Sequence, residues 1–307
     1  MSIFSLLLTR YSATQIDFQR PAKRLMTCIR PMGVCMLLLF ALPSFGRASP
    51  ARVVSMHFCT DQLISSLGAS AQLISASYLS DDARLGTATF SRPFHFNHAN
   101  ADEVALLHPG LVVTDAYSAS NTLQLLNKLH IRTLSLPALQ NLDTMMQRIT
   151  VLGDALGQHD RAAAVVGNLR SAISGLQAAG KQRRALVLQN GGWMATDDSL
   201  AIDLLRHTDL VDVRPVSQRN WQRATAEQVI TWQPQIIIVF KSSNAAPGLG
   251  QAWLQQDWLQ QGPWQLITLT DDGLACGTPE VIRTLEQLNQ QLAILPTDSS
   301  RSLEHTP

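Results

Sequence analysis

The sequence predicts an α/β protein with two lobes, each built on a mostly parallel sheet covered by helices. Short apolar runs that suit buried strands alternate with helical periodicity twice along the chain, over 52–136 and over 184–292. A purely helical stretch at 145–180 separates these two sweeps. The 307 residues are enough for two domains, and a hydrophobic content of 46% excludes a disordered chain.

The first lobe is predicted over residues 49–158. Its apolar runs predict strands at 52–55, 73–77, 111–114 and 132–136. The periodicity between them predicts helices at 61–67, 101–107 and 121–129. The lobe closes with a helix that ends at Gly157 and carries an apolar face made of Met145, Ile149, Leu152 and Leu156.

A connecting helix is predicted over 159–180, with Asp160 as its N-terminal cap. At 1.5 Å per residue it would span roughly 30 Å, about the width of one lobe. The second lobe is predicted over 181–294, with strands at 184–189, 235–240 and 266–269 and helices at 199–206, 225–231 and 278–292. Residues 295–307 are expected to be a disordered tail.

Residues 1–48 are expected to be a secretory signal rather than part of the fold. Six basic residues stand against a single acid, Asp17, and the apolar run Gly33–Leu42 is too short to cross a hydrocarbon core of ~30 Å. Pro43 and small residues follow, so we expect cleavage near Ala48, export to the periplasm and no stable membrane insertion of the mature chain. An N-terminal anchor or a buried helix is the alternative.

Removal of this segment changes both charge and cysteine count. The full chain has a net charge of +1, whereas the mature chain keeps 18 basic against 22 acidic residues, so no basic field exists to bind nucleic acid. Only Cys59 and Cys276 remain, and two cysteines in an oxidising compartment commonly form a disulfide. The alternative is a pair of free thiols able to bind a soft metal.

One unit occurs in both predicted lobes. It is a short helix with an acid in its first turn, then a helix-stopping proline, then a strand, and it begins at Ala101 and at Thr225. Glu103 and Glu227 therefore occupy equivalent places in the two units. An acid at this position stabilises a helix N-terminus, which is the ordinary interpretation of both.

These features resemble the periplasmic substrate-binding proteins of ABC importers for iron–siderophores, haem and vitamin B12. The resemblance is carried by RVVSMHFCTDQL at 52–63, by the two Glu…Pro…strand units and by the helix from Asp160. Cys-Thr-Asp at 59–61 and Leu-Ala-Cys-Gly at 274–277 resemble the branch that binds B12. The resemblance implies two Rossmann-like lobes joined by a long backbone helix, the class III architecture, with the ligand held between the lobes.

The resemblance also implies the roles of particular residues. Glu103 and Glu227 would dock the two lobes onto the permease, which works with its ATPase, and the binding protein itself would be a monomer. Trp221 lies six residues before Glu227, where the B12-binding relative has a tryptophan against its ligand. The ligand is expected to be cobalamin or another corrinoid first, and a ferric siderophore or haem second, with no cofactor belonging to the protein.

Loops that follow the predicted strands supply the candidates for the binding cleft, since ligands of open α/β sheets bind beyond the carboxyl ends of strands. The set is aromatic and nearly neutral, which suits a flat, partly apolar ligand. Its members are His57, Phe58, Cys59, Tyr78, His98, Tyr117, Trp193, Trp221 and Cys276. The other four tryptophans, Trp232, Trp253, Trp258 and Trp264, are expected in helical stretches as packing residues.

Histidines could bind the metal of the ligand, and His57, His95 and His98 are the candidates. Hydrogen bonding within the loops is the favoured alternative. A siderophore site would need several arginines or tyrosines for anionic groups, and only Arg219 and Arg223 flank Trp221.

The chain has no G-x-S-x-G, H-E-x-x-H, Walker or G-x-G-x-x-G motif. We therefore expect no enzyme, with a periplasmic metal-dependent enzyme or a sensor domain as the alternative.

Overall fold

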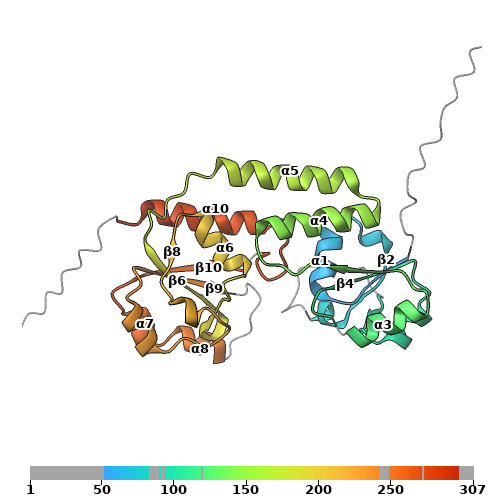
Figure 1. Ribbon diagram of the computed structural model, residues 1–307, viewed down its shortest axis with the longest axis horizontal. Coiled ribbons are helices and arrows are strands. Elements are labelled where there is room, and N and C mark those ends of the chain that lie inside the picture. Colours follow the sequence, from blue (N-terminus) through green and yellow to red (C-terminus); the bar gives the residue numbers. More distant parts are fainter. Residues whose placement is uncertain are drawn as a thin grey trace, which may run out of the picture. The chain divides into compact units, whose positions relative to one another are not determined.

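The computed structural model describes residues 52–82, 90, 94–118, 120–241, 249–271 and 273–296 (Figure 1). The predicted signal segment at 1–48 and most of the predicted tail lie outside these residues. Two five-stranded sheets, both mostly parallel, alternate with helices along the chain. The α/β class and the two-sheet architecture predicted from the sequence are confirmed.

The first sheet has the strand order β3-β2-β1-β4-β5, and every neighbouring pair is parallel. Its strands are β1 (Val53–Ser55), β2 (Leu73–Ser77), β3 (Phe96–Asn97), β4 (Leu111–Asp115) and β5 (Thr133–Leu136). The helices between them are α1 (Phe58–Ser66), α2 (Ala101–Leu106) and α3 (Ser120–Lys128), with the short turns η1 (Ser70–Gln72) and η2 (Tyr78–Asp81). All strand carboxyl ends therefore meet at one edge of this sheet.

The second sheet has the order β10-β9-β6-β7, with β8 also paired to β6. Its strands are β6 (Arg184–Gln189), β7 (Trp193–Met194), β8 (Val211–Asp212), β9 (Ile236–Lys241) and β10 (Gln265–Thr270), and only the pairing of β7 with β6 is antiparallel. Its helical elements are η3 (Asn190–Gly192), α6 (Leu200–His207), η4 (Val216–Gln218), α7 (Ala226–Trp232), α8 (Leu249–Leu254), α9 (Asp257–Gln260) and α10 (Val281–Ile294).

Both sheets are buried on their two faces, as parallel sheets require. Val53 belongs to one apolar cluster and Val54 to another, so successive residues of β1 face opposite layers. The same alternation occurs in β6, where Val187 and Leu188 belong to different clusters. The largest cluster contains side chains from both sheets, together with those of α1, α4 (Leu142–Leu156), α6 and α10.

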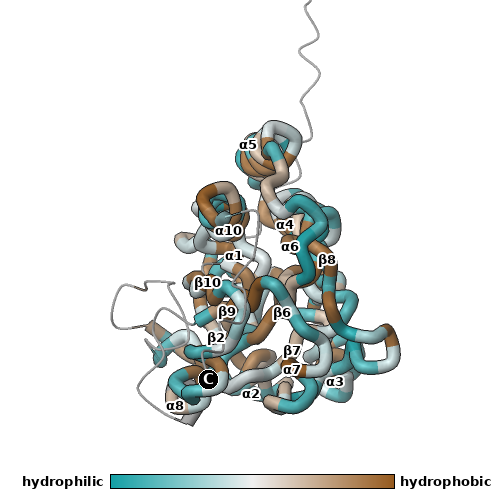
Figure 2. The backbone as a smooth tube through the Cα atoms, turned by 90° about the vertical axis from the view of Figure 1, so that its left-hand side faces the viewer, coloured by the Kyte–Doolittle hydropathy of each residue, from teal (hydrophilic) through white to brown (hydrophobic). Residues whose placement is uncertain are grey.

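Helix α5 (His159–Gly175) follows α4 and contacts both α4 and α10 (Figure 1). It buries only Ala162, Val166 and Leu169, while most of its other residues are exposed. Figure 2, which views α5 nearly end-on, shows that both hydrophobic and hydrophilic residues occur around it. A helix with one buried stripe is what a connector lying across other helices requires.

Several local predictions were wrong. The connecting helix ends at Gly175 rather than near 180, and Asp160 lies inside its first turn while Gln158 occupies the cap position without a side-chain bond. Helix α1 begins three residues earlier than expected, because the side chain of His57 caps it by accepting the N–H of Cys59. Trp264 lies between α9 and β10 rather than in a helix, although it is buried as expected.

The length and hydropathy of the described helices were compared with those of a membrane-spanning helix. None of those within the described ranges combines the length and the hydropathy of a membrane span.

Candidate functional site

Candidates in the first lobe lie at the carboxyl ends of four adjacent strands. His57 and Phe58 follow β1, Tyr78 follows β2, His98 follows β3 and Tyr117 follows β4. Because these strands are parallel neighbours, their ends share one edge of the sheet. The structure thus brings the predicted residues of this lobe to a common edge, although they are spread over 61 positions of sequence from His57 to Tyr117.

His57 serves the helix that follows it. Its Nδ1 accepts the N–H of Cys59 at 3.2 Å, and its ring lies 4.9 Å from that of Phe58. Burial lowers the pKa of His57, Asp115 acts to raise it and Arg148 acts to lower it. The neutral ring therefore carries its proton on Nε2. This arrangement favours the hydrogen-bonding interpretation of His57 over the metal-binding one.

Tyr78 and His98 form the second aromatic contact at this edge. Their rings are stacked at 4.9 Å with an interplanar angle of 21°, and Tyr78 is 47% exposed. His98 also receives support from α2, since Glu103 accepts its backbone N–H at 2.9 Å. His95 lies apart from this pair and bonds the hydroxyl of Ser75 at 2.9 Å. The two histidines predicted as a metal pair are therefore engaged separately.

A buried ion pair supports the end of β4. Asp115, the last residue of that strand, accepts a 2.6 Å bond from Arg148 of α4, and both side chains are at least 93% buried. Breaking such a pair leaves an uncompensated buried charge, so the pair holds the strand end in one position. Tyr117 follows two residues later and is 79% exposed, with no ring contact among the described residues.

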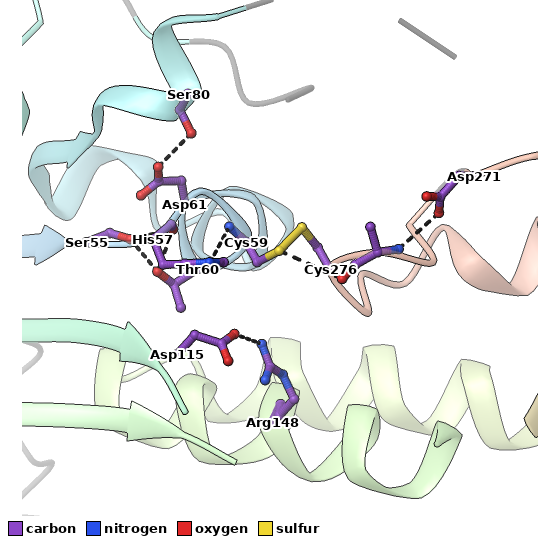
Figure 3. The surroundings of a disulfide bond; sticks show 11 residues. Ser55, His57, Cys59, Thr60, Asp61, Ser80, Asp115, Arg148, Asp271 and Cys276 are labelled. Atoms are coloured by element: carbon purple, nitrogen blue, oxygen red, sulfur yellow. Dashed lines mark hydrogen bonds and ion pairs between the residues drawn. A yellow bond between two sulfur atoms is a disulfide. The ribbon is translucent and has the colours of Figure 1, made fainter. Parts of the chain in front are cut away.

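Asp61 anchors the segment that carries Tyr78 (Figure 3). Its Oδ2 accepts the N–H of Ser77 at 3.0 Å and the hydroxyl of Ser80 at 2.6 Å, while its buried Oδ1 has no hydrogen-bond partner. Burial raises the pKa of Asp61 to about 7, against the lowering effect of the nearby Ser55 hydroxyl and of the hydrogen bonds from Ser80 and Ser77. The carboxyl group of Asp61 therefore titrates near neutral pH.

Replacing Asp61 with Asn should change how stability depends on pH. The folded pKa of about 7 exceeds the unfolded value of about 3.9, so the contribution of Asp61 to stability is full below pH 4 and is lost as the pH rises through 7. Asp61→Asn should match the wild type near pH 4 and exceed its free energy of unfolding at pH 8 by on the order of 4 kcal/mol. Urea unfolding from pH 4 to 8 measures this difference. Asp102→Asn, at an exposed position of α2, is the control. If the free energy of unfolding of Asp61→Asn and of the wild type depends on pH in the same way, the prediction is contradicted.

The two cysteines of the predicted mature chain are bonded to each other (Figure 3). The S–S distance is 2.09 Å and the Cα atoms are 4.8 Å apart, within the separation that a disulfide allows. Cys59 lies in the first turn of α1, and Cys276 lies in the loop between β10 and α10. The bond is 5% and 3% exposed at its two ends, so it joins elements of the two sheets while presenting little surface to a ligand.

Trp193 and Trp221 form one stacked pair. Their rings are 5.3 Å apart and inclined by only 6°, and Trp221 remains 54% exposed. Backbone pairing brings them together, because Met194 donates to the carbonyl of Gln222 at 2.8 Å and Ala224 donates to that of Gly192 at 2.9 Å. Arg223 lies against the Trp193 ring at 5.5 Å. The pair presents a flat indole face next to polar loops.

A turn with two glycines presents Trp193. Gly191 and Gly192 both have φ of +77°, which L side chains rarely adopt. A Cβ on Gly192 would lie 2.3 Å from the buried ring of Trp253. The Gly-Gly sequence is thus required both by the turn and by the tryptophan of α8 that packs beneath it.

A pocket of about 520 Å³ adjoins this pair, and we call it the Trp221 pocket. It is lined by Trp221 and Asn220, by Gln140 from the loop before α4, and by Asp197 from the segment before α6. A second pocket of about 270 Å³ includes Gln189, Leu139 and Ala275 in its lining. Both pockets are therefore bounded by loops of each half of the chain.

The family assignment follows from comparison with known proteins. The family model described as "Periplasmic binding protein" matches residues 53–262, well over half of the chain. The chain belongs to this family. It is a periplasmic binding protein of the ABC-importer type.

The names of proteins related to this binding protein state different ligands. A vitamin B12-binding protein of Yersinia pestis is 23% identical over 275 residues, covering 87% of this chain and 95% of that protein. The structure of vitamin B12-binding BtuF of Vibrio cholerae has a TM-score of 0.56 at 19% identity, covering 80% and 98% of the two chains. Haem-binding HutB of Vibrio cholerae has a TM-score of 0.60 at 18% identity, covering 78% and 98%. At such identities the two structures establish a shared fold.

The repeated acids of the binding protein differ slightly in position. Glu103 is the third residue of α2 and is partly buried against His98, whereas Glu227 is the second residue of α7 and is exposed. Both acids nevertheless lie in the first turn of their helices, as the repeated unit predicts. Hydrogen bonds from its own N–H and from the hydroxyl of Thr225 lower the pKa of Glu227, which keeps it ionised at neutral pH.

Metal binding by protein side chains has no support in the described part of the chain, where no cluster of three or more His, Cys, Asp or Glu residues is arranged to hold an ion. Sequence reasoning missed Gln140, Asp197 and Arg206 as lining residues of the Trp221 pocket. No local pattern marks them. They come from separate segments, and only the tertiary structure brings them beside Trp221.

Proposed function

We propose that this binding protein captures a corrinoid of the vitamin B12 type in the periplasm and delivers it to an ABC permease. The observation that carries the proposal is the half-exposed Trp221, stacked on Trp193 beside a pocket. A rigid indole pair offers a large flat surface at little cost in conformational entropy, which suits a planar macrocycle. The relationship to the Yersinia pestis vitamin B12-binding protein over 87% of the chain gives further support.

The proposed ligand lies between a first lobe at 49–158 and a second lobe at 181–294, with 159–180 as the connector. His57, Phe58, Tyr78, His98 and Tyr117 would contact it from the first lobe, and Trp193 and Trp221 from the second. The Cys59–Cys276 bond would restrain the two sides from separating. The mature chain would begin near residue 49 and act as a monomer.

Isothermal titration calorimetry tests this proposal. Cyanocobalamin should bind with one site per chain, more tightly than haem or a ferric hydroxamate siderophore. Saturable binding of haem or of the siderophore, together with no heat from cyanocobalamin, would refute the corrinoid assignment and favour the second-choice ligands.

Glu103 and Glu227 are proposed to dock the two lobes onto basic pockets of the permease. Charges of this kind orient and steer a partner more than they bind it. The double variant Glu103→Gln and Glu227→Gln should leave ligand affinity unchanged and cut uptake in cells about tenfold or more. The matched control is Asp102→Asn with Asp257→Asn, two exposed acids in the first turns of α2 and α9. Uptake that stays at the control level would leave the two glutamates with helix stabilisation alone.

A further inference from the structure

The charged groups of the Trp221 pocket are paired with one another. Arg219 lies 3.4 Å from Asp197 and 3.8 Å from Asp212. Arg206 lies 3.3 Å from Asp197 and 4.0 Å from Asp203. Asp197 thus bridges the two guanidinium groups that line the pocket, and each of them has a second carboxylate beside it.

The charged residues in and beside the Trp221 pocket carry a slight net negative charge when they are counted together. Arg214 is fully buried and makes a bidentate contact with Asp212, so three arginines are matched by three aspartates. Asp198 also lines the pocket and forms no ion pair with the described residues, which leaves one negative charge in excess. An anionic group of a ligand would be repelled by this excess negative charge, and it would find no unpaired guanidinium group in the pocket to bind.

Arg223 is the other cation of this region. It lies against the Trp193 ring rather than among the residues that line the pocket. The pocket itself offers neutral hydrogen-bonding groups, because the side-chain amides of Gln140 and Asn220 are exposed there and make no hydrogen bond to other described residues. Each carboxamide supplies both donors and an acceptor, which matches the groups of another carboxamide.

We infer that the Trp221 pocket selects the amide-bearing edge of a flat macrocycle over a carboxylate-bearing edge, because its arginines are already neutralised by Asp197 and its neighbours. This inference rests on the proposed function and adds the chemical basis of ligand choice. Specificity here arises from a repulsive element, the excess carboxylate, as well as from amide contacts. Haem carries carboxylates at its edge, whereas a corrinoid of the B12 type carries amides.

Two corrins that differ chiefly in this chemistry test the inference. Dicyanocobinamide carries peripheral amides, and dicyanocobyrinic acid carries carboxylates in their place. The wild type should bind the amide form at least about 100-fold more tightly in calorimetric titration at pH 7.5. Equal affinities for the two would overturn the inference and leave the proposed function standing. Failure of both corrins and of cyanocobalamin to bind would overturn the proposed function itself.

Two variants with the same charge change separate arginine pairing from overall charge. Asp197→Asn removes the carboxylate shared by Arg206 and Arg219 and leaves each with one carboxylate, whereas Asp198→Asn removes a carboxylate that pairs with neither. Asp197→Asn should raise affinity for the carboxylate corrin about tenfold, and Asp198→Asn about threefold or less. Asp197 is 47% exposed, so the variant is expected to fold, which thermal unfolding would verify. Equal gains in the two variants would overturn the role of the paired arginines.

Discussion

Loss of the Cys59–Cys276 bond is expected to lower the free energy of unfolding by about 4 kcal/mol, within the usual range of about 2 to 5. The bond closes a loop with a sequence separation of 217 residues, so it strongly restricts the unfolded chain. Both sulfur atoms are buried, and serine can replace them without a large change in volume. The double variant Cys59→Ser and Cys276→Ser, unfolded in urea beside the oxidised wild type, measures the effect.

A reducing agent provides the control for this experiment. Dithiothreitol should shift the unfolding midpoint of the wild type toward that of the double variant and leave the variant itself unchanged. If the oxidised wild type and the variant unfold at the same denaturant concentration, the bond does not contribute to stability in solution.

Trp221→Ala is expected to weaken corrinoid binding about 30-fold, or about 2 kcal/mol, with little change in the unfolding midpoint. The side chain is 54% exposed and contacts the rest of the protein chiefly through Trp193. Its removal therefore deletes ligand contact surface but little core packing. Calorimetric titration with cyanocobalamin gives the affinity, and thermal unfolding gives the stability.

Trp258→Ala is the matched control for Trp221→Ala. Trp258 is partly buried and packs edge-on against Trp253 and Trp264, which belong to the core on one face of the second sheet. Its removal should lower stability by about 3 kcal/mol while leaving affinity unchanged. Unaltered affinity in Trp221→Ala, or an equal loss of affinity in both variants, would remove Trp221 from the site.

The regular elements could be predicted from the sequence because each has its own periodic signal. The apolar run before Phe240 predicts β9, and the stripe that includes Val166 and Leu169 predicts α5. The strands β3, β7 and β8 were missed because each has only two residues, too few to show a period. β3 and β8 pair with β2 and β6 across long intervening segments, whereas β7 pairs with the preceding strand β6 across the short turn η3.

The candidate site was predictable as a set of residues but not as an arrangement. Trp193 and Trp221 each follow a loop signal, yet their stacking depends on backbone pairing between Gly192–Met194 and Gln222–Ala224. Arg219 could be seen beside Trp221 in the sequence, whereas its neutralisation by Asp197 and Asp212 could not. The cysteine pairing, in contrast, was indicated by compartment and count alone.

A crystal structure of the mature chain with cyanocobalamin is the most direct measurement of the central claim. It should show the corrin within van der Waals distance of the exposed Trp221 ring, with its peripheral amides directed toward Gln140 and Asn220 in the Trp221 pocket. A ligand bound away from the Trp193–Trp221 pair, or one that turns a different edge toward this pocket, would contradict the account.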